Sequence, residues 1–137
     1  MTRRYQRKQA FTLIEMMIIF CVIAALAVMA IPHILRSKIT ANQVNAKATL
    51  KAVGVALEAY LTDHSLYPSG VSHLMGDKYP YLNKNYFEGE HCGYTFSAEI
   101  DDSSYTVTAT PVSVYTGTKI LTMTTGIVFS EAAAEFE

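Results

Sequence analysis

The sequence is poor in charge and in cysteine, and each shortage excludes a class of protein. Only 17% of the 137 residues are charged while 50% are hydrophobic, which excludes a disordered or polyelectrolyte chain. The formal net charge of −1 argues against a general nucleic-acid binder, because neutralising phosphates requires a surplus of lysine and arginine. Two cysteines, Cys21 and Cys92, are too few for a disulfide framework. The length suits one domain of ordinary size.

The sequence also lacks recognisable catalytic and metal-binding motifs. Its four histidines have no metal-ligand spacing, and it has no glycine-rich phosphate loop. His91 precedes Cys92, but adjacent residues in a strand point to opposite faces, so the pair does not predict a nucleophile and its base. Glu99, Asp101 and Asp102 match no calcium loop, and a hairpin turn is the simpler interpretation. We therefore expect no enzyme, no metal ion and no cofactor.

Charge and hydrophobicity are concentrated near the start of the chain. Residues 1–10 carry four basic residues and no acid, whereas the remainder holds seven bases and twelve acids. Residues 16–31 are all apolar, and the stretch 11–35 is interrupted only by Thr12, Glu15 and His33. About 25 such residues are enough to cross a hydrocarbon core of ~30 Å. The pattern predicts a single-pass membrane protein with a cytoplasmic N terminus and an exported remainder.

An acidic residue inside this segment needs an explanation. An ionised carboxylate in a spanning helix costs about 2.5–3.5 kcal/mol on insertion scales. Glu15 either lies near the cytoplasmic interface and reaches water, or it meets a cation in an assembled state. No lysine or arginine lies between Ala10 and Arg36, so the available cation would be a newly made chain terminus.

Residues 10–15, Ala-Phe-Thr-Leu-Ile-Glu, stand between the basic leader and the apolar run, and in this setting they resemble the processing site of type IV pilin-like proteins. The resemblance implies that a membrane peptidase cuts between Ala10 and Phe11 and methylates the new amino group of Phe11. It implies that Glu15 pairs with the terminal ammonium of a neighbouring subunit. Pro32 matches a proline that kinks the family's spanning helix. Ala10 replaces the family's more frequent glycine.

The resemblance further implies a structural role and a set of partners. The chain would be the homo-oligomeric subunit of a type IV pilus-like helical filament, handled by a prepilin peptidase, an assembly ATPase and an inner-membrane platform protein. It would reside in the inner membrane before assembly and in a cell-surface or periplasmic filament afterwards. The major pseudopilin of a type II secretion system is an alternative within the same family.

A different class of protein also fits part of the pattern. Val28 and Ala30 are small enough for an ordinary signal peptidase to cut after Ala30, which would release a secreted binding domain beginning at Ile31. The apolar run is longer than the usual 7–15 residues of a signal peptide, and Glu15 would remain unexplained within it. The first residue of the mature protein, Phe11 or Ile31, distinguishes the two interpretations.

The rest of the chain predicts an α+β fold, with a long N-terminal helix packed on a small four-stranded antiparallel sheet. After a cleaved leader (1–10) and a transmembrane or filament-core helix (11–35), the exported domain occupies residues 36–137. We expect the helix to continue through 36–62, followed by a loop (63–92), the sheet (93–130) and a tail (131–137). Apolar residues at helical spacing mark the face of the second helical half that should be buried: Ile39, Ala46, Leu50, Val53, Leu57 and Tyr60.

Overall fold

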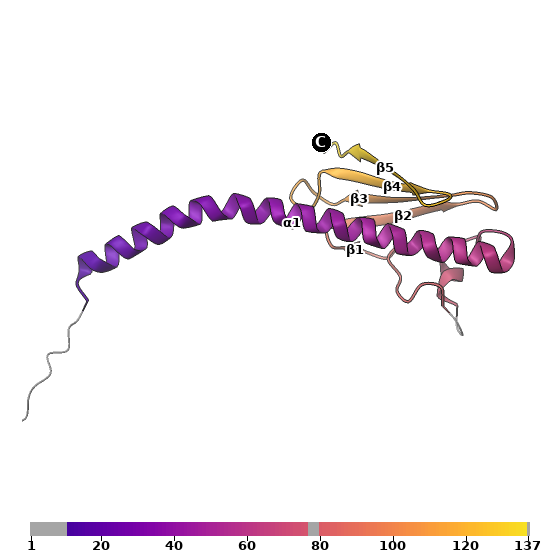
Figure 1. The fold of residues 1–137 in the computed structure, drawn as a ribbon, viewed down its shortest axis with the longest axis horizontal. Coiled ribbons are helices and arrows are strands. Elements are labelled where there is room, and N and C mark those ends of the chain that lie inside the picture. The colour runs from indigo at the N-terminus through magenta and orange to yellow at the C-terminus, as the bar shows by residue number, and fades with distance from the viewer. Residues whose placement is uncertain (1–10, 77–79, 137) are drawn as a thin grey trace, which may run out of the picture. The chain divides into compact units, whose positions relative to one another are not determined.

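The computed structural model describes residues 11–76 and 80–136 (Figure 1). Their elements are the helix α1 (Leu13–His64), the short 3-10 helix η1 (Val71–Met75), and strands β1 (Glu90–His91), β2 (Tyr94–Ile100), β3 (Tyr105–Pro111), β4 (Lys119–Thr124) and β5 (Val128–Ala133). Two compact units make up the chain: unit 1 is Met1–Leu35 and unit 2 is Arg36–Glu137. The α+β class is confirmed, although the sheet has five strands rather than the four predicted.

Helix α1 ends two residues later than predicted, at His64. Ser65 takes the left-handed conformation, with φ at 62°, and its backbone N donates to the Leu61 carbonyl at 2.7 Å. A left-handed residue directly after a helix satisfies one of the carbonyls that the last turn leaves free. Pro68 follows shortly afterwards and prevents the helix from resuming.

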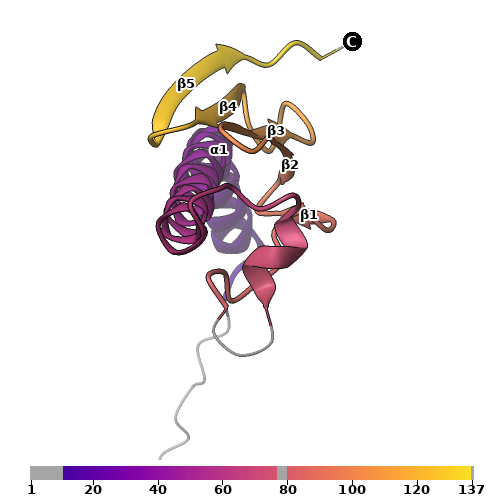
Figure 2. The same cartoon turned by 90° about the vertical axis from the view of Figure 1, so that its right-hand side faces the viewer.

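The core of unit 2 lies between one face of α1 and the sheet (Figure 2). On the helix, Ala46, Leu50, Val53 and Leu57 are buried, as the predicted stripe required. Ile39 and Tyr60, at the two ends of that stripe, are only partly buried. Five sheet side chains with almost no exposure pack against the helix: Tyr94, Tyr105, Val107, Leu121 and Met123. Burying apolar surface stabilises a fold by roughly 25 cal/mol per Å², so this layer is the main source of stability in unit 2.

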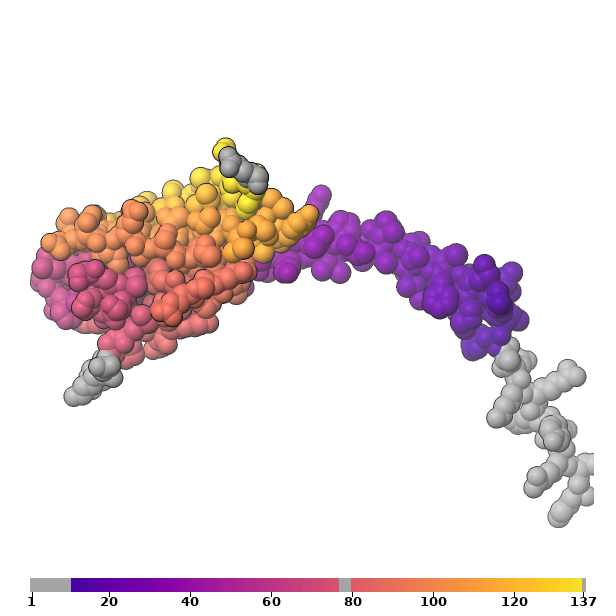
Figure 3. Space-filling view, turned by 180° about the vertical axis from the view of Figure 1, so that it is seen from behind, coloured from indigo at the N-terminus to yellow at the C-terminus, as the bar shows by residue number. Residues whose placement is uncertain are grey.

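The sheet is an antiparallel meander with the order β1-β2-β3-β4-β5. Strand β3 alternates buried and less buried residues, which is typical of a sheet with one face on the core. Strand β5 differs, because all six of its residues are exposed. The space-filling view shows the later strands of unit 2, in orange and yellow, gathered on one side of that unit (Figure 3).

Glu58 connects the far end of the helix to the sheet. Its carboxylate accepts a hydrogen bond from the Tyr67 hydroxyl at 3.2 Å and from the backbone N of Gly126 at 3.0 Å. Gly126 lies in the β4–β5 turn and has a φ of 77°, a conformation that favours glycine. One carboxylate therefore holds both Tyr67, three residues after the helix end, and the last turn of the sheet.

Two parts of the predicted layout differ from the structure. Residues 63–92 were expected to form a loop, but they contain η1 and β1. Strand β1 is only two residues long, and it pairs with β2 across a turn in which Cys92 and Gly93 both have positive φ. Strand β5 runs to Ala133, three residues beyond the predicted end of the sheet. A two-residue strand and an unburied strand both lack the hydrophobic alternation from which strands are predicted.

Candidate functional site

The start of α1 is the first candidate site, because the predicted processing and assembly residues meet there. Ala10 lies outside the described residues, and Phe11 is 75% exposed. Thr12 precedes the first helical residue, and its carbonyl accepts the first helical hydrogen bond from Met16 at 3.3 Å. Thr12 is therefore the residue that caps the helix.

Thr12 and Glu15 cap the helix reciprocally. The backbone N of Glu15 donates to the Thr12 hydroxyl oxygen at 3.3 Å, and the backbone N of Thr12 donates to Glu15 Oε2 at 2.8 Å. The Thr12 hydroxyl also donates to Glu15 Oε2 at 2.8 Å. This is the capping-box arrangement, in which two backbone donors at a helix start are satisfied by side chains. The Thr-x-x-Glu spacing of residues 12–15 is the sequence signal for this capping box.

The capping box fixes the Glu15 carboxylate at the helix start and leaves part of it available. A carboxylate accepts about four hydrogen bonds, and both bonds to Thr12 go to Oε2. Among the residues that the structure describes, no lysine, arginine or histidine forms an ion pair with Glu15. Among the described residues, both of the bonds from Thr12 use Oε2, so that Oε1 keeps its capacity to accept a hydrogen bond.

The part of α1 in unit 1 forms an apolar surface. Every residue from 11 to 35 is exposed, including the large side chains of Ile14, Phe20 and Leu26. By length and composition α1 qualifies to cross a membrane, with a mean hydropathy of 2.7 in its most apolar window and no burial there. Such a surface requires a covering of lipid or of other helices, because apolar groups in water are unfavourable.

Pro32 lies inside α1. It has no backbone N–H, so the Val28 carbonyl loses its usual partner four residues later in the helix. The residues on both sides remain helical. The predicted kink stays a prediction.

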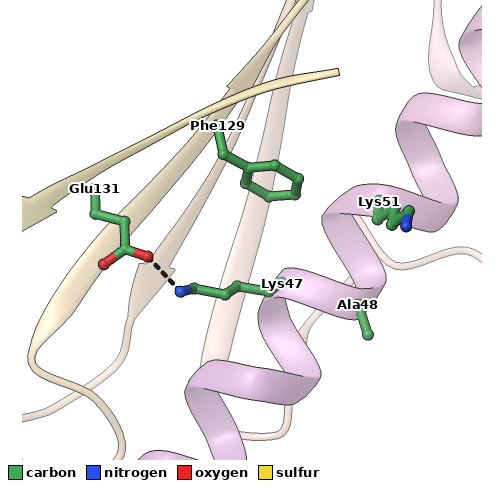
Figure 4. A pocket seen from close by; sticks show the side chains of 5 residues that line it. All are labelled: Lys47, Ala48, Lys51, Phe129 and Glu131. Atoms are coloured by element: carbon green, nitrogen blue, oxygen red, sulfur yellow. Dashed lines mark ion pairs between the residues drawn. The ribbon is translucent and has the colours of Figure 1, made fainter.

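A groove between α1 and β5 is the second candidate site (Figure 4). It has a volume of about 320 Å³ and is lined by Lys47, Ala48, Lys51, Phe129 and Glu131. Glu131 forms ion pairs with Lys47 and with Lys119, the latter at 2.7 Å. Hydrogen bonds from Lys119 and Lys47 lower the pKa of Glu131 to about 2. Sequence analysis missed this cluster, since only the pairing of β5 brings position 131 beside the helix.

The remaining chemistry-bearing residues do not gather into a site. Cys21 and Cys92 are both free thiols and both exposed. Within residues 11–76 and 80–136, no three histidine, cysteine or acidic side chains lie close enough to share a metal ion, and this includes the Glu99–Asp102 region.

The chain is similar to a competence protein, to type II secretion system core proteins and to a type IV major pilin. The chain is 29% identical over 79 residues to competence protein ComGC of Halalkalibacterium halodurans, a match that spans 58% of this chain and 78% of that protein. It is 36% identical over 66 residues to type II secretion system core protein G of Pseudomonas aeruginosa, covering 47% of this chain and 46% of that protein. It is 32% identical over 80 residues to type IV major pilin protein PilA of Myxococcus xanthus, covering 55% and 36%.

The matches differ in how much of each relative they span. The chain covers most of ComGC but less than half the length of core protein G and of PilA. No protein-family model matches the chain. The α+β architecture, with one long apolar N-terminal helix on an antiparallel sheet, is the one that the resemblance implied. The resemblance predicted from residues 10–15 is thereby confirmed: the chain is similar to type IV pilins and pseudopilins.

Proposed function

We propose that the chain is a structural subunit of a type IV pilus-like filament, polymerised from the inner membrane through helix packing. The observation that carries this proposal is the exposed apolar surface of residues 11–35. Lipid covers this surface before assembly, and the same segments of neighbouring subunits cover it in the filament. Similarity to a major pilin and to secretion core proteins supports the proposal.

Processing prepares the start of the helix for this assembly. A prepilin peptidase cuts between Ala10 and Phe11 and methylates the amino group of Phe11. Glu15 then accepts the terminal ammonium of a neighbouring subunit on the carboxylate oxygen that Thr12 does not use. Because the capping box already holds the carboxylate in place, little further ordering is needed when the ammonium arrives. An assembly ATPase and a platform protein in the inner membrane supply the energy and the scaffold.

The charge of Glu15 is tested separately from its capping role by Glu15→Gln. Glutamine also serves at this position of a capping box, so the helix start is preserved while the negative charge is lost. We expect normal insertion, normal cleavage and a sharp loss of filaments. Electron microscopy of sheared surface fibres, beside an immunoblot for the mature chain, measures both properties.

Thr12→Val is the matched variant, because it removes the capping hydroxyl and keeps the charge of Glu15. It should retain filaments to a greater extent than Glu15→Gln. Abundant filaments from Glu15→Gln would overturn the ammonium pairing. If the wild-type protein is not inserted in the membrane, the filament proposal itself is overturned.

A type II secretion pseudopilin is the second candidate function. Core protein G from several organisms, including Klebsiella pneumoniae and Vibrio cholerae, is among the similar proteins. Genes that flank this one decide between the two functions. A retraction ATPase indicates a pilus, whereas an outer-membrane secretin together with other pseudopilins indicates secretion.

The secreted-domain alternative predicts a cut after Ala30, which lies inside α1. N-terminal sequencing of the mature protein separates it from the filament proposal, because Phe11 supports the filament subunit and Ile31 the secreted domain.

A further inference from the structure

The loop between β3 and β4, residues 112–118, exposes apolar side chains at one end of unit 2. Tyr115 is 69% exposed, Val112 49% and Val114 45%. The loop contains no charged residue. Exposed apolar side chains this close together on one short loop point to a surface that something covers.

The loop is firmly held. Within it, the Thr116 hydroxyl donates to the Ser113 carbonyl at 2.9 Å and accepts from the Ser113 backbone N at 3.0 Å. Gly117 lies directly beneath Tyr94, so that a β-carbon at position 117 would collide with the Tyr94 hydroxyl. The exposed side chains therefore project from an ordered loop, and little entropy is lost if they bind a surface.

The loop lies beside the first turns of helix in unit 2. The Asn42 side chain donates to the Thr116 carbonyl at 3.0 Å, and the Gln43 side chain donates to the Thr118 hydroxyl at 3.0 Å. Asn42 is six residues after Arg36, the first residue of unit 2, which is about 9 Å along a helix axis.

The membrane boundary lies at this end of unit 2 if residues 11–35 span the bilayer. The headgroup layer on each side of the hydrocarbon core is about 5–7 Å thick, and spanning helices tilt by about 20° on average. The loop lies about 9 Å from this boundary along the helix axis, slightly farther than the headgroup layer is thick. A tilt of the helix toward the loop therefore brings the loop to the headgroups. Residues 36–43 add two bases, Arg36 and Lys38, and no acid, which suits contact with lipid phosphates.

We propose that the β3–β4 loop is a lipid-binding element that rests Tyr115 and its apolar neighbours in the headgroup layer of the outer leaflet before assembly. Tyrosine suits this layer because its ring is apolar and its hydroxyl is polar. Extraction of the subunit into a filament would then have to release the loop from lipid as well as the helix. This inference rests on the proposed anchorage of unit 1 in the membrane.

The absence of tryptophan from the chain makes a direct test possible. Three full-length variants each carry one fluorophore: Tyr115→Trp in the loop, Phe20→Trp in the apolar segment, and Ser103→Trp in the β2–β3 turn. That turn lies at the opposite end of unit 2, because the Asp102 carbonyl accepts from Tyr67 just after the helix end. Each variant is reconstituted at high lipid excess into phosphatidylglycerol and phosphatidylethanolamine vesicles, with and without lipids brominated near the carbonyl end of the acyl chain. Circular dichroism confirms that each variant folds.

We expect brominated lipid to quench Tyr115→Trp and Phe20→Trp and to leave Ser103→Trp bright. If Tyr115→Trp stays as bright as Ser103→Trp while Phe20→Trp is quenched, the loop proposal is overturned and the anchorage stands. A blue shift of Tyr115→Trp that grows with the protein-to-lipid ratio and resists quenching would show a second copy on the loop, which also overturns lipid binding. An unquenched Phe20→Trp would overturn both the anchorage and the loop proposal.

Discussion

Gly54 of the helix faces Met123 of β4 so closely that a β-carbon at position 54 would lie 2.5 Å from the Met123 methyl carbon and 3.0 Å from its sulfur. The Tyr105 hydroxyl would lie 3.3 Å away. Gly54 is the one glycine of α1, and its lack of a β-carbon leaves room there for the Met123 side chain. Alanine is favoured over glycine within a helix by about 1 kcal/mol, so the two effects of Gly54→Ala oppose each other.

We expect Gly54→Ala to lower the free energy of unfolding by about 1 kcal/mol. Overpacking a core costs about 1–3 kcal/mol, which exceeds the gain in helix propensity. In a Met123→Ala background the clash with Met123 is gone and only the 3.3 Å contact with the Tyr105 hydroxyl remains, so Gly54→Ala should there stabilise by up to about 1 kcal/mol. Urea denaturation followed by circular dichroism measures all four proteins, and an equal effect of Gly54→Ala in both backgrounds would disprove the clash.

The ion pairs of Glu131 predict a dependence of stability on acid. Lys119 and Lys47 lower the pKa of Glu131 from its ordinary value of 4.5 to about 2 in the folded protein. A carboxylate whose folded pKa is depressed stabilises the fold above its unfolded pKa, and it loses that contribution as pH falls from about 4.5 toward 2. The effect should be modest and weaker in high salt, since the groups are exposed.

The substitution Glu131→Gln tests the contribution of these two ion pairs to stability. The difference in melting temperature between wild type and Glu131→Gln should be present at neutral pH and should shrink as the pH falls below 4.5. Glu99→Gln is the control, because Glu99 lies in β2 and forms no ion pair among the described residues. A difference that stays constant down to pH 2 would show that position 131 acts through packing instead.

Cleavage at Ala10 predicts a precursor phenotype. Because the peptidase is expected to need a small residue before the cut, Ala10→Leu should accumulate uncleaved protein that is still inserted in the membrane. Intact-mass measurement should show ten additional residues, and Ala10→Gly should process normally as the control. Normal processing of Ala10→Leu would move the cleavage site elsewhere.

Cys92 should be unpaired within its own subunit, because Cys21 is held in the bilayer if the proposed topology is right. Both thiols are free and exposed in the structure. Alkylation without reductant, followed by mass spectrometry, should label both cysteines, and a bridge between positions 21 and 92 of one chain would contradict the topology. Cys92→Ser should leave the monomer unchanged on non-reducing electrophoresis.

Sequence patterns predicted those parts of the fold in which burial is periodic. The stripe from Ala46 to Leu57 was identified because one face of a helix is buried, and β3 because alternate residues are. Strand β5 extended further than predicted because none of its residues is buried, so that backbone pairing with β4 alone defines it. The end of α1 was predicted to within two residues, since Pro68 and Gly70 mark a turn shortly after it.

Of the two candidate sites, one is formed by residues that are neighbours in sequence and the other by residues that are far apart in sequence. Phe11 and Glu15 were predicted as site residues because their neighbours in sequence form a recognisable order, and their roles stay predictions. The Thr12 capping box lies in the same six residues. The cluster of Lys47, Lys119 and Glu131 joins residues from three elements. No local pattern encodes it, because it exists only after the sheet has formed beside the helix.

The meander order of the sheet has a consequence for how the protein folds. Each strand pairs with the strand just before it in the sequence, so no segment has to wait for a distant one in order to find its place. If the N terminus stays in the cytoplasm and the residues after the spanning segment are exported in chain order, the second half of the helix and then β1 to β5 arrive in their order of pairing. The exported unit can therefore fold during translocation, and each newly arrived strand covers the open edge left by its predecessor.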